Sequence, residues 1–467
     1  MIMAGAPNSA EAGPGTWGEL LSRRYLGACI VLAGGVALYA TNEFLTVSLL
    51  PSTVAEIGGQ RLYAWVTSVY LVASVAAATT VGGLLARYGP RRAYLIALAV
   101  FGAGSLLCAG AQTMELLLAG RGLQGIGGGV LAGLGYAVIN AALPPSLWTR
   151  GSALVSAMWG VGCLVGPAAG GFFAQIGQWR WAFGVLVILT VLMALVVPWA
   201  LPAGRRAGAA ARTEIPVRSL LLLGVAALAI SAAGLPDRVE ATAALLAVGM
   251  ALVAVFVVLD RRARVSVLPA TAFRPGPLKW MYLTLGLLMA ATMVDMFVPL
   301  FAHRLAGLTP LAAGFLAAGL SVGWTGGELI SAIVDRRAVS SRIVALAPAL
   351  MALGLTLAAL TQRVDAGPRD VAAWVVALVV TGAGVGIAWP HLSAWVMGAV
   401  DDPDERTVAA AAINTVQLIC GAFGAGLAGV VVNLTDDGGA APARWLFGVF
   451  AVLALLGLTA SVRAARR

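Results

Sequence analysis

The sequence predicts an all-α polytopic membrane protein that consists of two six-helix bundles and an inserted two-helix hairpin. Three observations support this fold class. Of the 467 residues, 60% are hydrophobic and 11% are charged, whereas about a quarter of the residues in a soluble domain are charged. Apolar runs of about 20 residues, long enough to cross a bilayer, follow one another along the whole chain. Most basic residues fall in alternate connections between these runs, as the positive-inside rule requires.

Fourteen apolar runs qualify as membrane spans. The seventh and eighth runs are short, and the brief polar turn 235–239 joins them. The alternative is therefore a twelve-span protein in which this pair lies at the membrane interface. The fourteen runs begin near Leu26, Leu62, Arg92, Met114, Gly151, Trp181, Val217, Glu240, Pro277, Thr309, Arg342, Val371, Thr407 and Trp445.

The order of six, two and six spans predicts a duplicated bundle. The connection after the second span, GGLLARYGPRRAYL from Gly82, has an echo in SAIVDRRAVSSRIVAL from Ser331, because both place small and apolar residues before a basic turn. Such repeats are typical of secondary transporters, whose substrate site lies between the halves near the membrane midplane. The predicted divisions are a cytoplasmic tail (1–25), an N-terminal six-helix bundle (26–201), a linker with two extra transmembrane helices (202–276), a C-terminal six-helix bundle (277–463) and a second cytoplasmic tail (464–467).

The net charge of +10 would suit a nucleic-acid partner in a soluble protein, but here the basic residues flank apolar spans. We expect their role to be topological, with membrane lipids as partners and no nucleic acid. Arginine outnumbers lysine 29 to 1, which is typical of a GC-rich bacterial genome. The predicted location is the bacterial cytoplasmic (inner) membrane, multi-pass, with both termini in the cytoplasm. The four cysteines lie in different spans, which argues against a disulfide or a metal cluster.

One stretch combines high apolarity with residues that weaken helices. Residues 162–171 read GCLVGPAAGG, inside an apolar run from about Ser152 to Gln175. In a water-exposed helix each glycine would cost about 1 kcal/mol and the proline about 3 kcal/mol relative to alanine. In a bilayer, neighbouring helices compensate for the proline, and glycines allow a second helix to approach closely. The stretch therefore predicts a kinked membrane helix whose flat face makes a tight contact that can move.

The motifs together resemble those of the major facilitator superfamily, in particular its fourteen-span drug:proton antiporter branch and the mycobacterial multidrug exporters. Gly162–Gly171 matches the fifth-span antiporter motif at every position. Leu117–Gly129 resembles the fourth-span motif, and Asn42–Gly58 resembles the first-span motif. The two echoing connections resemble the cytoplasmic loop signature of the superfamily.

The resemblance implies the major facilitator fold and a secondary active transporter rather than an enzyme. The expected activity is proton-coupled multidrug efflux, in which hydrophobic or cationic small molecules are exported by alternating access, with antibiotic resistance as the outcome. No cofactor or metal is expected, and we expect a monomer. Two positions differ from the family pattern: Ala86 stands where the loop signature has an aspartate, and Asn42 stands where the first-span motif has its acid, with Glu43 next to it.

Two other readings stay open. A lipid or glycolipid exporter of the same fold would need a similar hydrophobic cavity. A polytopic membrane enzyme is a remote alternative, because the sequence has no HExxH or GxSxG motif and no nucleotide-binding glycine loop ending in Lys-Ser or Lys-Thr. The acidic cluster of Asp401, Asp402, Asp404 and Glu405 fits a helix-capping loop better than a metal site.

Ionisable residues inside spans are costly and are therefore functional candidates. At a rise of 1.5 Å per residue, Glu43, Arg121 and Asp295 share a depth of roughly 9 to 14 Å below the outer boundary. Burial disfavours a charged carboxylate and a nearby arginine stabilises it. We hypothesise that Glu43 binds the transported proton, that Arg121 biases its ionisation, and that Asp295 is a second site. The alternative is a permanent Glu43–Arg121 ion pair that locks two spans together. Glu328, nearer the cytoplasmic side, completes the predicted proton-coupling set.

A cytoplasmic gate is predicted around the basic loops and the fifth span. Asp335 and Arg336 form the expected gate, and Asp335 should approach the start of that span, where the helix dipole and Arg150 favour a negative charge. Ala86 cannot make the equivalent contact in the other half, so the gate should be asymmetric. His391 is expected to be a packing residue rather than a proton relay. The predicted gating residues are Arg87, Arg91, Arg150, Gly162, Gly166, Pro167, Gly170, Gly171, Asp335 and Arg336.

Substrate contacts are expected from aromatic, amide and methionine side chains that face the middle of the protein. A wide, mostly apolar pocket with few polar groups accepts many amphipathic molecules. Trp65, Trp181 and Trp445 lie near span ends and are instead expected to anchor the chain at the membrane interface. The predicted substrate-binding residues are Tyr39, Asn42, Gln124, Asn140, Trp159, Met293, Trp324, Trp389, Asn414 and Gln417.

Overall fold

The computed structural model describes residues 16–202, 216–236, 238–264, 266–331, 334, 336–400 and 403–466. Over these residues the chain is helical and contains no strand, which confirms the predicted fold class. The helices are α1 (Trp17–Leu20), α2 (Leu26–Ile57), α3 (Tyr63–Ala78), α4 (Val81–Ala109), α5 (Met114–Ala137), α6 (Ile139–Ala142), α7 (Trp148–Gln175), α8 (Trp179–Ala200), α9 (Val217–Ala232), α10 (Val239–Asp260), α11 (Leu278–Thr292), α12 (Val298–Ala306), α13 (Pro310–Ser331), α14 (Arg337–Thr361), α15 (Pro368–Gly398), α16 (Pro403–Thr435) and α17 (Ala441–Ala465). Short 3₁₀ turns η1 (Gln60–Leu62), η2 (Pro145–Leu147), η3 (Ala270–Phe273) and η4 (Met293–Phe297) complete the described elements.

Each of the fourteen predicted apolar runs lies in helical structure. Eleven helices of the described part are long and apolar enough to cross a membrane. The glycine-containing α5 and α13 and the 16-residue α9 are not among these eleven. The count of fourteen spans therefore stays a prediction. The second and third runs are joined through α4, where Gly89 adopts φ +73° just before Pro90 and turns the chain.

The N-terminal bundle contains α2, α3, α4, α5, α7 and α8, and its tightest seam joins α2 to α7. The glycines of the fifth-span motif form this seam. A methyl group added at Gly162 would lie 2.6 Å from Cβ of Ala40, and one added at Gly166 would lie 2.6 Å from Cβ of Phe44. These distances confirm the tight helix contact expected from the sequence, because only glycine leaves room for the α2 backbone.

The C-terminal bundle contains α11 to α17, with the ninth predicted span broken into α11, η4 and α12. Glycine again brings helices together here, since Gly323 of α13 lies against the backbone of Val379 in α15, and Gly382 of α15 lies against the backbone of Leu320 in α13. The break at η4 matters for the site, because Asp295 lies within it.

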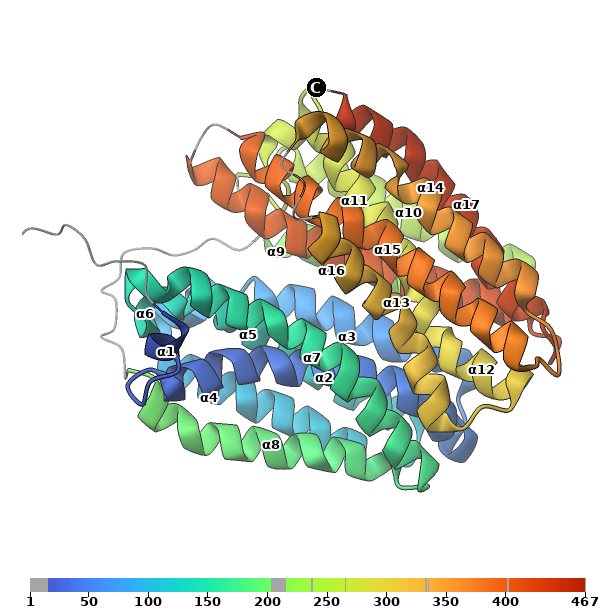
Figure 1. The fold of residues 1–467 in the computed structure, drawn as a ribbon, viewed down its shortest axis with the longest axis horizontal. Helices are drawn as coiled ribbons and strands as arrows, with labels where there is room; N and C mark the ends of the chain where they lie inside the picture. Colours follow the sequence, from blue (N-terminus) through green and yellow to red (C-terminus); the bar gives the residue numbers. More distant parts are fainter. Residues whose placement is uncertain are drawn as a thin grey trace, which may run out of the picture.

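The two bundles meet at one end of the molecule, opposite the end that holds α1 and Arg466. In Figure 1 the blue-to-green helices of the first bundle and the yellow-to-red helices of the second converge beside α12. There Tyr63 Oη donates a hydrogen bond of 3.1 Å to the Met296 carbonyl. A methyl group added at Gly171 would lie 2.6 Å from Cα of Leu311. We call this end the contact end and the other the terminal end.

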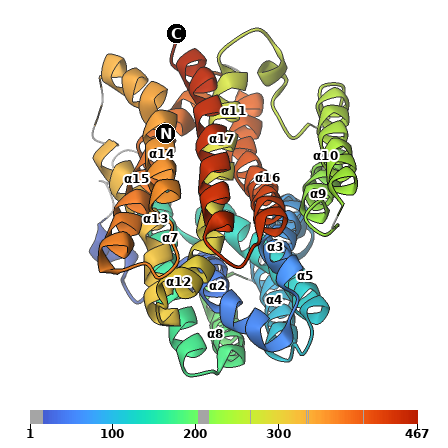
Figure 2. The ribbon, with the colours of Figure 1, turned by 90° about the vertical axis from the view of Figure 1, so that its right-hand side faces the viewer.

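The hairpin of α9 and α10 lies along the side of the two bundles, as Figure 2 shows. Helix α9 packs against α3 and α16, whereas α10 packs mainly against α9. Trp65 Nε1 donates to the Ser231 carbonyl at 3.1 Å, and the Ser231 hydroxyl donates to Ser68 Oγ at 2.9 Å. Trp65 therefore fastens the hairpin to α3 in addition to any role at the membrane interface.

Candidate functional site

A cavity of about 350 Å³ lies between the two bundles, on the terminal side of the contacts just described. Helices α2, α3, α5 and α7 line it from one bundle, and α11, η4, α13, α15 and α16 line it from the other. Eight of the residues singled out in the sequence line this cavity: Glu43, Trp159, Met293, Asp295, Trp324, Glu328, Trp389 and Gln417.

The cavity brings three carboxyl groups from three different elements together: Glu43 of α2, Asp295 of η4 and Glu328 of α13. The Oε2 atom of Glu43 is buried and has no hydrogen-bond partner in the described part of the protein. A buried charge without a partner is expensive, whereas a neutral carboxyl group costs far less. Glu43 is therefore placed where a bound proton would remove most of the cost of its burial.

Arg121 lies next to this region but forms no ion pair with Glu43, because none of the ion pairs between described residues includes either side chain. Its Nε atom donates to the Val66 carbonyl at 3.2 Å, and its Nη1 atom donates to Gln124 Oε1 at 2.9 Å. Its guanidinium also stacks on Tyr70, with Cζ 4.0 Å from the ring centroid. The permanent Glu43–Arg121 ion pair considered above is thus absent, and α5 is tied to α3 instead.

Gln124 lies inside the N-terminal bundle and does not line the cavity. Its side chain is fully buried, and Nε2 donates to Ser105 Oγ at 2.9 Å. Since its carbonyl oxygen accepts from Arg121, Gln124 connects α4 and α5 through side chains alone. Gln124 is therefore placed to hold the Arg121 side chain in position. Ser105 and Tyr70 could not be predicted as partners, because the spacing of residues does not reveal which face of α4 or α3 turns toward α5.

Aromatic side chains form two groups around the cavity. Tyr39 stacks on Tyr70 with ring centroids 5.5 Å apart, and it meets Trp159 edge-on at 5.5 Å. Trp324 and Trp389 face each other from α13 and α15 at 5.3 Å. Tyr39 and Asn42 are buried and lie outside the cavity lining. The side chains of Asn140 and Asn414 are outside the described part of the structure.

Several lining residues were missed by the sequence reasoning. Met289 and Met296 flank the predicted Met293 and could have been found from the spacing of three to four residues, which places side chains on one helix face. The missed lining residues include Phe44, Thr67, Tyr136, Cys163, Met289, Met296, Ser321 and Thr325.

The predicted gate is only partly described, since Asp335 lies outside the described residues. Arg336 is exposed, and Arg87 stacks on the neighbouring Tyr88 at 5.3 Å. Arg91 Nε donates to the Leu201 carbonyl at 3.1 Å and so fastens α4 to the end of α8. Arg150 is half-buried in the first turn of α7.

His391 lies in α15 and contacts the end of α13. Its Nε2 atom is 2.9 Å from Ser331 Oγ, and the Ser331 hydroxyl donates to the Ile387 carbonyl at 2.6 Å. These bonds join the end of α13 to α15. In the described part of the chain no cluster of histidine, cysteine or acidic residues could hold a metal ion.

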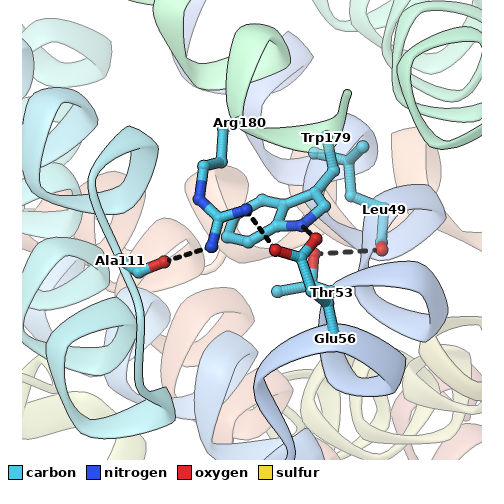
Figure 3. A network of polar contacts seen from close by, with 6 residues as sticks. All are labelled: Leu49, Thr53, Glu56, Ala111, Trp179 and Arg180. Carbon is cyan, nitrogen blue, oxygen red and sulfur yellow. Dashed lines mark hydrogen bonds and ion pairs between the residues drawn. The ribbon is translucent and has the colours of Figure 1, made fainter. Parts of the chain in front are cut away.

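A polar cluster at the contact end was not predicted. Figure 3 shows Glu56, at the end of α2, between Trp179 and Arg180 at the start of α8. Trp179 Nε1 donates to Glu56 Oε2 at 2.6 Å, Arg180 Nη1 pairs with Glu56 Oε1, and Arg180 Nη2 donates to the Ala111 carbonyl at 2.9 Å. The cluster holds the end of α2 that lies at the contact end and therefore positions the helix that carries Glu43.

Two helical bundles around a central cavity, with carboxyl groups and aromatic rings inside it, define a secondary transporter in structural terms. The family model of the Major Facilitator Superfamily matches residues 32–425. The chain belongs to the major facilitator superfamily, as its motifs indicated.

Relatives and solved structures agree with this assignment. The chain is 61% identical over 459 residues to a Mycobacterium tuberculosis protein named "Probable multidrug-efflux transporter", with 97% of each chain covered. It is 24% identical over 369 residues to Multidrug resistance protein 3 of Bacillus subtilis, with 77% of this chain and 70% of that chain covered. The structure of the nucleoside transporter NupG matches 96% of this chain and 100% of its own, at 14% identity and a TM-score of 0.66. A bacterial homologue of the human lysosomal transporter Spinster, inward-facing and unoccupied, matches 95% and 98% at 15% identity and a TM-score of 0.61. The two solved structures share the fold.

Proposed function

We propose that this protein is a proton-coupled multidrug efflux transporter that exports hydrophobic or cationic small molecules by alternating access. The observation that carries the proposal is the cavity between the bundles, in which three carboxyl groups lie among tryptophan, tyrosine and methionine side chains. Aromatic and thioether groups adapt to apolar rings of different shape, and carboxylates attract cations. The name of the mycobacterial relative supports the same substrate class.

In this proposal proton binding and substrate binding alternate at the carboxyl groups of Glu43 and Asp295. When the cavity is open to the acidic side, protons neutralise the carboxyl groups, and a cationic substrate loses its counter-charge and leaves. When the cavity opens to the other side, the protons leave and the next substrate binds. Arg121 holds positive charge beside this region and favours release of the proton. Glu328, nearer the terminal end, would be the first carboxylate that an entering cation meets.

The orientation follows from the same proposal. The terminal end faces the cytoplasm of a bacterial inner membrane, both termini are cytoplasmic, and the protein works as a monomer. The divisions 26–201, 202–276 and 277–463 are the moving and connecting units, and fourteen spans cross the bilayer. A lipid or glycolipid exporter is the alternative, but three cavity carboxylates favour a cation over an anionic lipid headgroup.

The test is drug transport in proteoliposomes under an imposed pH gradient. Glu43→Gln keeps the shape of the side chain and removes the proton site, so we expect substrate to bind and the gradient to drive no transport. Glu115→Gln is the matched control, because it makes the same chemical change at an exposed position, in the first turn of α5. Transport by Glu43→Gln equal to that of the control would move coupling to Asp295 or Glu328, and a wild-type protein indifferent to the gradient would exclude proton coupling.

A further inference from the structure

A second cavity of about 790 Å³ opens on the side of the protein, between the hairpin and the C-terminal bundle. Its walls come from α9 and α10 on one side and from α11, α16 and α17 on the other, and η3 closes one end. The walls are made of large apolar side chains such as Met250, Phe256, Leu283 and Phe423. We call this cavity the hairpin groove.

The hairpin groove exists because α10 is held at a distance from the bundle. Helix α10 packs mainly against α9, and α9 packs against α3 and α16, so the hairpin covers α11 and α17 without contacting them broadly. Figure 2 shows α10 apart from α11 and α17. An apolar space offers water no hydrogen-bond partners. In a chain that crosses a bilayer, hydrocarbon is the material that fills such a space.

Positive charge lies at one end of the hairpin groove. Lys279 is the one charged residue among the described residues that line it. Lys279 Nζ lies 5.5 Å and Arg463 Cζ lies 4.4 Å from the centroid of the Trp280 ring, so both cations share one indole. Neither cation takes part in an ion pair with another described residue. This end therefore has, beside an amphipathic ring, two cations that no acid of the described residues neutralises.

The acid that precedes Lys279 in the sequence does not neutralise these charges. Asp260, at the end of α10, accepts hydrogen bonds from the backbone amides of Val267 and Leu268 at 2.8 and 3.0 Å, and it is buried. No other acid occurs between residues 261 and 294. The same connection adds exposed basic residues at this level: Arg261, Arg262, Arg264 and Arg274.

We propose that the hairpin groove binds one anionic phospholipid, with its acyl chains between α10 and α11 and its phosphate between Lys279 and Arg463 beside Trp280. Tryptophan is favoured at the level of lipid headgroups, and basic residues next to a membrane span attract anionic lipids. The bound lipid joins the hairpin to the C-terminal bundle where protein contacts are few. This site is separate from the central cavity and does not depend on what that cavity transports.

The experiment compares lipid retention by the full-length protein in nanodiscs that contain equal amounts of phosphatidylglycerol and phosphatidylcholine. Native mass spectrometry after extraction counts the lipids that stay bound. Wild type should retain one phosphatidylglycerol. The double variant Lys279→Gln/Arg463→Gln should retain it roughly 30-fold less, because each basic residue contributes a factor of about five to lipid affinity.

Two controls keep the result specific. Arg23→Gln/Arg24→Gln removes two exposed cations that do not line the groove, and it should retain the lipid as wild type does. Lys279→Arg/Arg463→Lys keeps the charges and should also retain it, which separates loss of charge from misfolding. A photoactivatable phosphatidylglycerol should label peptides of α10 and α11.

Other outcomes would overturn the proposal. Equal retention by the Lys279→Gln/Arg463→Gln variant would show that these cations do not hold a headgroup. Retention of phosphatidylcholine at the same level would show that the groove takes acyl chains without regard to charge. A stable dimer with α10 and α11 protected from the photoactivatable lipid would assign the groove to a second copy of the chain.

Discussion

The seam between α2 and α7 offers the sharpest test of the packing described above, through the substitution Gly166→Ala. The added methyl group would lie 2.6 Å from Cβ of Phe44 and 2.9 Å from the backbone nitrogen of Leu45. Carbon atoms in contact prefer about 3.5 to 4.0 Å, so the two helices would have to separate by roughly 1 Å. Overpacking of this kind costs about 1–3 kcal/mol. Because Phe44 and Leu45 directly follow Glu43, we also expect drug transport to fall.

The control is Gly160→Ala, six residues earlier on the same helix, where an added methyl group would meet no atom within 4 Å. Because Gly160 lines the central cavity, it serves as the control for thermal unfolding and not for transport. This control gains the helix propensity of alanine, which is worth up to about 1 kcal/mol, and meets no steric penalty. The assay is thermal unfolding of the purified protein in detergent, followed by transport in proteoliposomes. If Gly166→Ala unfolds at the same temperature as Gly160→Ala, the seam is not close-packed in the membrane and the reasoning fails.

Two further predictions concern residues near the cavity. Gln124→Leu should destabilise the protein by about 1–3 kcal/mol, because it leaves the buried Nη1 of Arg121 without its acceptor, and it should lower the transport rate with little change in drug affinity. A drop in drug affinity alone, measured by direct binding, would instead make Gln124 a substrate contact. Cys163 lines the cavity whereas Cys29 and Cys108 are buried, so a hydrophilic maleimide should label Cys163, and bound drug should slow the labelling. Labelling that persists in Cys163→Ser at the wild-type level would contradict this.

The sequence predicted the depth of the central residues better than their direction. Counting residues along a helix gives depth, and this placed Glu43 and Asp295 at one level, where the structure has both in one cavity. The direction of a side chain depends on helix rotation, which is set by packing. Gln124 was expected among the substrate contacts because it has an amide side chain in a span, whereas its side chain faces Ser105 of α4.

Glycine patterns were informative for a related reason. A row of glycines along a helix indicates that another helix approaches closely. For the fifth-span motif that helix is α2. The partner of a polar side chain is harder to predict from a sequence than a close contact between helices. Glu56 and Arg180 are far apart in the chain, and both stand at helix ends that are crowded with other polar residues, so their pairing required the three-dimensional arrangement of α2 and α8.

The last glycine of the fifth-span motif differs from the others in what it touches. Gly162, Gly166 and Gly170 face α2 within one bundle, whereas Gly171 faces Leu311 and Pro310 in the other bundle. A side chain at the first three positions would disturb both conformations of an alternating-access cycle alike. A side chain at Gly171 would clash with the other bundle only when the contact end is closed. Since 1.4 kcal/mol shifts an equilibrium tenfold, even one methyl group there could bias the population toward the conformation in which that end is open. One short motif thus holds three glycines that pack α7 against α2 and a fourth whose contact influences the balance between the two conformations.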